Sequence, residues 1–163
     1  MTSAAERAEE AMRRAQACER AEDLAGAVAA MSEAVELDPD SMKYRGLRGR
    51  LYSRQENWPA AIADFDSVLA VKPDAPSVLY SRGRARAMLD DLDGAIADFE
   101  HCIALEPTAA DALALLGSIR YYRGELSQAQ NAYLRAVEVE PERRDGLAGQ
   151  HLAEIERKLH VSP

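Results

Sequence analysis

The sequence predicts an all-α protein built from four stacked pairs of antiparallel helices. Prolines recur at a constant interval of 34 residues, at Pro39, Pro73, Pro107 and Pro141, so the chain repeats one structural unit. Aromatic residues make up only 6% of the 163 residues and alanine is abundant, a composition that favours closely packed helices over β-sheets. We place the repeats at 8–41, 42–75, 76–109 and 110–143, after a lead-in at 1–7 and before a C-terminal segment at 144–163.

Within each repeat, the residues at three positions agree in size. The eighth residue is small in all four copies: Ala15, Gly49, Gly83 and Gly117. The twentieth residue is always alanine: Ala27, Ala61, Ala95 and Ala129. The twenty-fourth residue is large: Met31, Phe65, Phe99 and Tyr133. Small residues let two helix backbones approach closely, and the large residue fills the remaining space. We expect a first helix over the opening fourteen or so residues of each repeat. A second helix is expected from the large seventeenth residue (Leu24, Trp58, Leu92, Leu126) to just before the proline.

The helix ends carry signals of their own. Ser3 followed by Glu6 is the pattern of a capping box that opens a leading helix. Directly before the second helices stand Asp23, Asn57 and Asp91, whose side chains accept hydrogen bonds from free backbone N–H groups. Near the end of the chain, four apolar residues fall on roughly one helical face: Leu147, Leu152, Ile155 and Leu159. We expect this segment to be a helix that caps the stack.

Together these features resemble the tetratricopeptide repeat (TPR) family. The resemblance rests on Gly49, Tyr52, Ala61, Phe65 and Pro73 of the second repeat, on their counterparts elsewhere, and on the string AIADF at 61–65 and 95–99. It covers residues 8–143. It implies a right-handed α-solenoid whose first helices line a concave groove and whose second helices form the convex back.

The formal net charge of −8 hides an uneven distribution between the two kinds of helix. The first helices of repeats two to four carry one acid, Asp111, and ten cations: Lys43, Arg45, Arg48, Arg50, Arg54, Arg82, Arg84, Arg86, Arg120 and Arg123. The matching second helices carry one cation, Arg135, and six acids. With the TPR resemblance, this distribution implies a basic groove on an acidic shell. Arg48 with Asp64, and Arg82 with Asp98, occupy equivalent positions, and we interpret both pairs as salt bridges within a repeat.

The groove positions that the resemblance implies bring cations and aromatic residues together. The candidate peptide-binding residues are Lys43, Arg50, Arg54, Tyr80, Arg84, Met88, Tyr121 and Tyr122. Arginine offers paired hydrogen bonds to carboxylates, and tyrosine supplies rigid contact area. Such a surface suits an extended or helical peptide with acidic side chains and an apolar anchor. The alternative interpretation is that the arginines are only solvated and the tyrosines pack between repeats.

One variant of the family does not match. TPR domains that bind chaperone tails hold two carboxylates with lysine and asparagine at set positions, and those positions are occupied here by Met12, Gln16 and Leu47. No enzymatic chemistry is indicated either. His101, His151 and His160 lack metal-ligand spacing with Cys18 and Cys102, and no phosphate-binding loop or nucleophile–base set occurs. We expect no enzyme, no metal and no cofactor.

The sequence therefore predicts a non-catalytic adaptor or scaffold that holds an acidic peptide segment of a partner protein in a basic groove. A different hypothesis is a homo-oligomer that assembles through the ends of the array. A third is RNA or another polyanion in the groove, which the net negative charge disfavours. The sequence shows no signal peptide and no stretch long enough to span a membrane, so we expect a cytoplasmic protein without membrane insertion.

Overall fold

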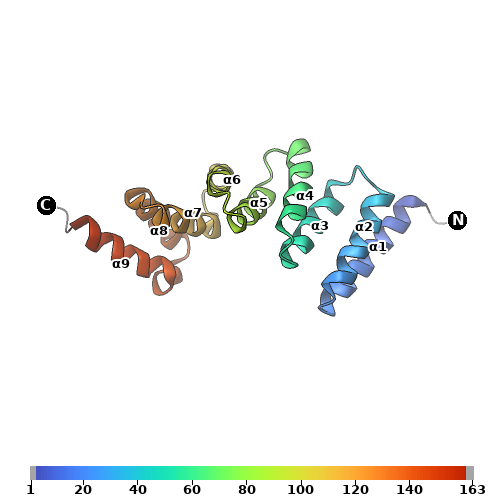
Figure 1. The fold of residues 1–163 in the computed structure, drawn as a ribbon, viewed down its shortest axis with the longest axis horizontal. Coiled ribbons are helices and arrows are strands. Elements are labelled where there is room, and N and C mark those ends of the chain that lie inside the picture. The colour runs from blue at the N-terminus through green and yellow to red at the C-terminus, as the bar shows by residue number, and fades with distance from the viewer. Residues whose placement is uncertain (1–2, 161–163) are drawn as a thin grey trace. The chain divides into compact units, whose positions relative to one another are not determined.

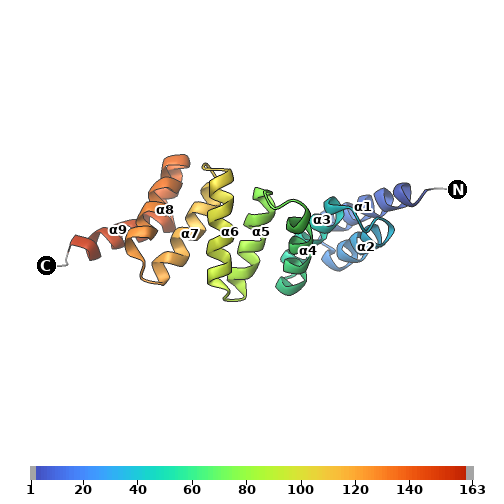
Figure 2. The same cartoon turned by 90° about the horizontal axis from the view of Figure 1, so that it is seen from above.

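A computed structural model describes residues 3–160. Every regular element in this range is helical, which confirms the all-α prediction (Figures 1 and 2). The chain divides into two compact units, Met1–Asp90 and Asp91–Pro163, and the division falls between the two helices predicted for the third repeat. The first two residues of the predicted lead-in and the last three of the predicted C-terminal segment lie outside the described residues.

From residue 3 onward, the first unit contains five helices. They are α1 (Ala4–Arg20), α2 (Leu24–Leu37), α3 (Met42–Arg54), α4 (Trp58–Val71) and α5 (Pro76–Met88). Helix α1 packs on α2 and α3 packs on α4, and contacts of α2 with α3 and of α4 with α5 join the pairs (Figure 1). The capping box is present, with Ser3 Oγ accepting from the Glu6 N–H at 3.1 Å. It opens α1 itself, so residues 4–7 belong to the first helix of the first pair.

The second unit begins at the second helix of the third repeat. It contains α6 (Leu92–Leu105), α7 (Ala110–Tyr122), α8 (Leu126–Val139), the short 3-10 helix η1 (Pro141–Asp145) and α9 (Leu147–His160). Helix α7 packs between α6 and α8, and α9 packs on α8 and η1. No helix in the part of the chain that the structure describes combines the length and apolar character needed to cross a bilayer.

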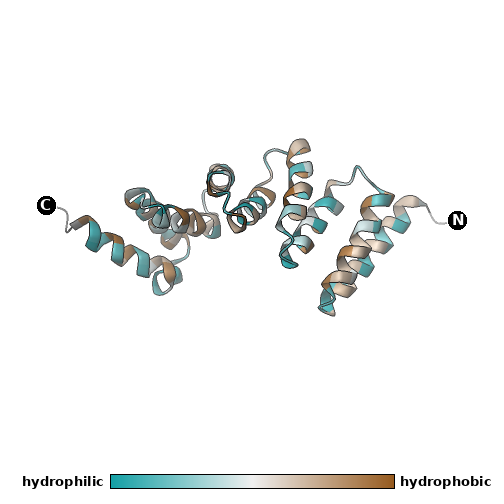
Figure 3. Cartoon of the chain, viewed as in Figure 1, coloured by the Kyte–Doolittle hydropathy of each residue, from teal (hydrophilic) through white to brown (hydrophobic). Residues whose placement is uncertain are grey.

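The predicted packing of small residues against large ones is confirmed. A Cβ atom added at Gly49 would lie 2.7 Å from the ring of Phe65, and one added at Gly117 would lie 2.8 Å from the ring of Tyr133. Both aromatic side chains are almost fully buried, so only glycine leaves room for them. Polar and apolar residues alternate along the helices in Figure 3, as expected of helices that bury one face.

The predicted starts of the second helices are also confirmed. Asp23 and Asp91 accept hydrogen bonds from the N–H groups of Gly26 and Gly94 at 2.8 and 3.0 Å. Asn57 caps α4 in the same way, through the N–H of Ala60 at 3.4 Å. These caps satisfy backbone donors that a helix leaves free in its first turn.

The C-terminal helix forms as predicted, but its buried face differs from the prediction. Leu152 and Ile155 are buried, whereas Leu147 is 55% exposed and Leu159 is 39% exposed. The face toward α8 is completed instead by Ala148 and His151. Steps of three or four residues keep side chains on one side of a helix, and 148, 151, 152 and 155 follow that rule more closely than the four apolar residues alone. The assignment of Leu147 and Leu159 to the packed face was therefore wrong.

Candidate functional site

Arg48 forms the inter-helix salt bridge that the sequence predicts. Its Nε and Nη2 donate to Asp64 Oδ2 and Oδ1 at 2.8 and 2.7 Å, and Asp64 is only 4% exposed. These hydrogen bonds raise the pKa of the Arg48 guanidinium. The equivalent pair, Arg82 and Asp98, consists of one residue from each unit and stays a prediction.

Most other cations of the first helices also have partners within the fold. In the first unit, Arg54 binds Glu19, Lys43 lies 3.7 Å from Glu9, and Arg82 and Arg86 lie 2.6 and 4.0 Å from Asp66. In the second unit, Arg120 binds Glu100, and Arg123 lies 2.6 Å from Asp93 and 2.8 Å from Glu125. Arg45 donates to the backbone carbonyl of Pro39 at 2.9 and 3.1 Å. Glu9 and Glu19 come from α1, Glu125 is the N-cap residue of α8, and the other acids come from second helices. Much of the predicted basic surface is thus paired internally.

Arg50 and Arg84 are exceptions. Neither makes a hydrogen bond or an ion pair with any residue between 3 and 160, and both side chains are exposed. The Arg84 guanidinium carbon lies 5.8 Å from the centre of the Tyr80 ring, within the range of a cation–π contact. Both guanidinium groups therefore keep hydrogen-bond donors available for a ligand.

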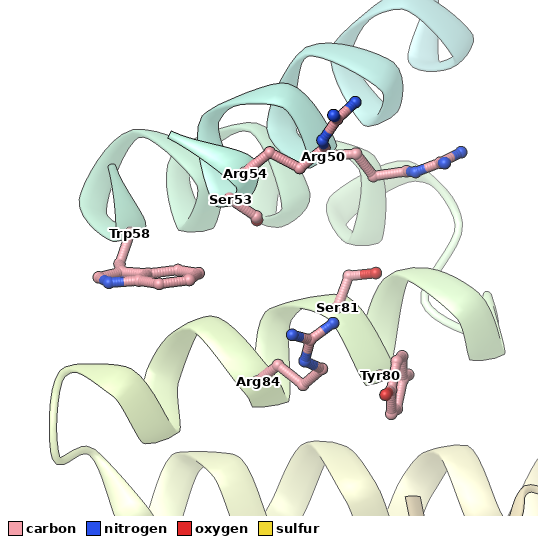
Figure 4. Close-up of a pocket in the computed structure, with 7 residues that line it drawn as sticks. All are labelled: Arg50, Ser53, Arg54, Trp58, Tyr80, Ser81 and Arg84. Carbon is pink, nitrogen blue, oxygen red and sulfur yellow. The ribbon is translucent and has the colours of Figure 1, made fainter. Parts of the chain in front are cut away.

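These two arginines line the same pocket of the first unit, which we call the arginine pocket. It has a volume of about 400 Å³ and is lined by Arg50, Ser53, Arg54, Trp58, Tyr80, Ser81 and Arg84. Figure 4 shows the residues of α3 on one side and those of α5 on the other, with the Arg84 side chain rising from α5 toward α3 and the Trp58 indole at one end.

Nitrogen atoms supply most of the hydrogen-bond donors in this pocket. Ser53 Oγ already donates to the carbonyl of Gly49 at 3.0 Å, and Ser81 Oγ donates to the carbonyl of Ser77 at 2.8 Å. Each hydroxyl has one proton, so the serines can only accept further hydrogen bonds. The guanidinium groups and the indole N–H of Trp58 remain as donors, and they match a ligand rich in acceptor oxygens.

A second pocket adjoins the first, and we call it the apolar pocket. It has a volume of about 420 Å³ and lies among α3, α4 and α5. Leu47, Phe65, Val68 and Val78 supply apolar surface. Three of its residues, including Arg50, also line the arginine pocket, so the two pockets form one continuous surface.

The structure brings together five of the eight residues that the sequence nominates. Lys43, Arg50, Arg54, Tyr80 and Arg84 line the arginine pocket or the apolar pocket. The other three lie elsewhere: Met88 is 61% exposed and lines neither pocket, and Tyr121 and Tyr122 belong to the second unit.

In the second unit, α9 packs over Tyr121. The ring of Tyr121 stacks on His151, with centroids 4.0 Å apart and planes at 10°. A hydrogen bond to Glu154 raises the pKa of the Tyr121 hydroxyl. Tyr122 is 74% exposed and meets Tyr121 edge-on, with the ring centroids 5.4 Å apart. Tyr121 is therefore engaged in packing between helices, as the alternative interpretation of the tyrosines states.

Sequence reasoning missed roles for Trp58 and His151. The sequence predicts Trp58 only as the large residue at the start of a second helix, whereas it is half-buried and forms one wall of the arginine pocket. The available signal was that the chain's one tryptophan stands where the other repeats have leucine. No sequence pattern predicts the role of His151, because its Nδ1 comes within 2.6 Å of the Tyr133 hydroxyl only once α9 has packed on α8.

The structure places the cysteines among packing residues. Burial raises the pKa of the Cys102 thiol, and Cys18 is half-buried against the core formed by α1, α2 and α3. Within residues 3–160, no group of His, Cys, Asp and Glu side chains is arranged to hold a metal ion.

The helix pairs, with glycines and alanines at their contacts, define an α-helical repeat protein. Models of the tetratricopeptide repeat match residues 6–41, 47–116 and 110–143. The chain belongs to the tetratricopeptide repeat family, as its sequence pattern predicts. No curated protein sequence matches the chain significantly.

Solved structures of TPR proteins share the fold. The crystal structure of MamA protein has a TM-score of 0.88 and 22% identity, with 96% of this chain and 84% of that chain covered. The first TPR domain of Spaghetti (RPAP3), bound to the HSP90 peptide SRMEEVD, has a TM-score of 0.67 and 23% identity, covering 76% of this chain and 97% of its own. YrrB, described as a TPR protein with an unusual peptide-binding site, has a TM-score of 0.77 and 19% identity, covering 92% and 76%. These similarities confirm the predicted helical-repeat fold.

Proposed function

We propose that this protein is an interaction adaptor whose first unit binds an acidic segment of a partner protein. TPR domains generally mediate protein–protein interaction and are typically non-catalytic. The observation that carries the proposal is that Arg50 and Arg84 make no hydrogen bond or ion pair within residues 3–160 and yet line one pocket with Trp58 and Tyr80. A ligand carboxylate would give these guanidinium groups the charge-assisted hydrogen bonds that they lack.

Because the protein has a negative net charge, its affinity for an acidic ligand depends on direct contacts in the pocket. With a formal net charge of −8, the protein as a whole repels an acidic ligand at long range. Attraction has to come from the guanidinium groups that a ligand touches directly, since charges separated by more than about 10 Å are screened at 0.1 M salt. Trp58 and Tyr80 add rigid aromatic area beside those charges.

Two structural relatives support a peptide as the ligand. The RPAP3 domain is described as bound to SRMEEVD, a peptide with three acidic residues around a valine, and YrrB is described as having a peptide-binding site. The contact residues proposed here differ from the chaperone-tail clamp, whose positions hold Met12, Gln16 and Leu47 in this chain.

The test is a binding measurement with a defined probe, the fluorescein-labelled peptide EEELEEE. The double variant Arg50→Glu, Arg84→Glu should bind it at least about 10-fold more weakly, because two charge-assisted contacts become repulsive. The control variant, Arg7→Glu with Arg157→Glu, makes the same charge change at two exposed sites outside both pockets. Circular dichroism checks that all three proteins are folded. Equal weakening in both variants, or none in either, would contradict the proposal.

The same samples separate the two other hypotheses. A concentration-dependent mass in sedimentation would favour a homo-oligomer that assembles through the array ends. A uridine heptanucleotide that displaces EEELEEE and binds more weakly as salt increases would favour a polyanion ligand.

A further inference from the structure

The apolar pocket depends on a glycine. Gly46 lies in the interior of α3, where glycine destabilises a helix relative to alanine. In the other two first helices of this unit, the equivalent fifth position of the repeat carries a large side chain, Met12 or Tyr80. Among the first helices of this unit, only that of the second repeat lacks a side chain at this position, and the pocket lies there.

Packing does not require this glycine. At Gly49 an added Cβ would lie 2.7 Å from the Phe65 ring, so glycine is needed there. At Gly46 the one heavy atom within 4 Å of an added Cβ is Val68 Cγ2, at 3.9 Å, which is an ordinary van der Waals contact. A side chain at position 46 would therefore fit the fold, and its effect would be to fill the apolar pocket.

The residues that line the apolar pocket indicate the kind of chemical group that it can bind. Its volume of about 420 Å³ is within the range of ligand pockets, roughly 300–1,000 Å³. Phe65 and Val68 are buried core residues that present apolar surface to it, together with Leu47 and Val78. The charged residues that line it, Lys43 and Arg50, are both cations, so an apolar group with neighbouring carboxylates is complementary to it.

We propose that the space left by Gly46 is a binding site for one large apolar side chain of a peptide ligand, such as leucine, with acidic residues on either side. The apolar side chain enters among Leu47, Val68 and Val78, and a neighbouring carboxylate reaches Arg50, which the two pockets share. The acidic flanks rest on the function proposed above, whereas the apolar site rests on Gly46 and the pocket itself.

Two substitutions at one position make a matched test. Gly46→Leu fills the pocket, and Gly46→Ala changes the helix in the same way but adds only the Cβ atom. Since that atom has room and both residues favour helix over glycine, both variants should melt at or above the temperature of the wild type.

Fluorescence anisotropy then compares two probes of equal charge, EEELEEE and EEEGEEE. The wild type and Gly46→Ala should bind the leucine peptide about 10-fold more tightly, from burial of one apolar side chain. Gly46→Leu should bind both peptides with the affinity of the glycine peptide. The proposal is overturned if the wild type binds both peptides equally tightly or if Gly46→Leu keeps the preference for the leucine peptide.

A neutral probe separates this site from the acidic-peptide function. N-acetyl-leucinamide should shift the methyl NMR signals of Val68 and Val78 in the wild type and in Gly46→Ala, but not in Gly46→Leu. If these shifts occur while neither peptide binds, the apolar site stands and the acidic-peptide function fails. If both peptides bind equally and the neutral probe gives no shifts, the apolar site fails and the function stands.

Discussion

Arg48 and Arg50 show how much the role of a residue depends on its surroundings. They are two residues apart on α3, so they point to different sides of the helix. The guanidinium of Arg48 is held by both oxygens of a buried carboxylate, whereas that of Arg50 is exposed and lines both pockets. The first arginine supports the fold and the second is available to a ligand.

This difference predicts that the same substitution destabilises the protein at position 48 and has little effect at position 50. Arg48→Gln should lower the free energy of unfolding by about 3 kcal/mol, because it leaves the Asp64 carboxylate buried without its ionic partner. Arg50→Gln should change it by less than about 0.5 kcal/mol, since it removes an exposed side chain with no partner in the described chain. Urea denaturation followed by circular dichroism measures both. Similar values for the two variants would mean that Asp64 does not depend on Arg48.

Helix α9 is attached to the rest of the second unit by apolar contacts, by the hydrogen bond between Glu154 and Tyr121, and by a buried polar cluster around Tyr133. The Tyr133 hydroxyl lies 2.6 Å from His151 Nδ1 and 3.0 Å from Ser118 Oγ, and Ser118 donates to the carbonyl of Ala114. Because Tyr133 donates its one proton to Ser118, the assignment that satisfies every group has His151 Nδ1–H donating to the Tyr133 oxygen. Burial raises the pKa of Tyr133 to about 12.

The raised pKa predicts how the attachment responds to alkali. In the unfolded chain the phenol ionises at its ordinary pKa of about 10, but in the folded protein only near 12, so its contribution is complete below pH 10 and is lost as pH rises to 12. Tyr133→Phe should cost about 1 kcal/mol at pH 8, through the lost hydrogen bonds. Between pH 10 and 12, the free energy of unfolding of Tyr133→Phe should then fall by about 2 kcal/mol less than that of the wild type.

Urea unfolding at fixed pH values from 8 to 12 makes this comparison. Ionisation of the other tyrosines is common to both proteins and cancels in the difference between them. Parallel stability curves over the whole range would show that Tyr133 is ionised as easily in the folded protein as in the unfolded chain.

At the scale of the whole molecule, the net charge and the pocket charge have opposite effects on an acidic ligand. Salt screens the long-range repulsion from the net charge of −8, so the association rate constant for EEELEEE should rise between 10 and 100 mM NaCl. Salt also weakens the contacts to Arg50 and Arg84, so the dissociation rate constant should rise as well. Stopped-flow anisotropy measures both. An association rate that falls with salt from the start would mean that the arginines, and not the net charge, control the approach.

Sequence alone was sufficient for the parts of the structure that depend on neighbouring positions. The interval between prolines, the caps at Asp23, Asn57 and Asp91, and the pairing of small with aromatic residues are local or repeat with a fixed period, so one copy predicts the next. The Arg48–Asp64 bridge was predictable for the same reason, because both residues lie within one repeat.

What only the tertiary structure decided is which charges are paired and where space is left. Glu9 and Glu19 of α1, in the first repeat, pair with Lys43 and Arg54 of α3, in the second, and these contacts exist only once the two helices lie side by side. The same holds for His151, which meets Tyr133 only when α9 packs on α8, and for Gly46, whose missing side chain matters because three helices surround it. Backbone geometry is set over a few residues, so sequence patterns reveal it. Ion pairs and cavities depend on side chains that are distant in the chain, so they appear only once the helices have packed.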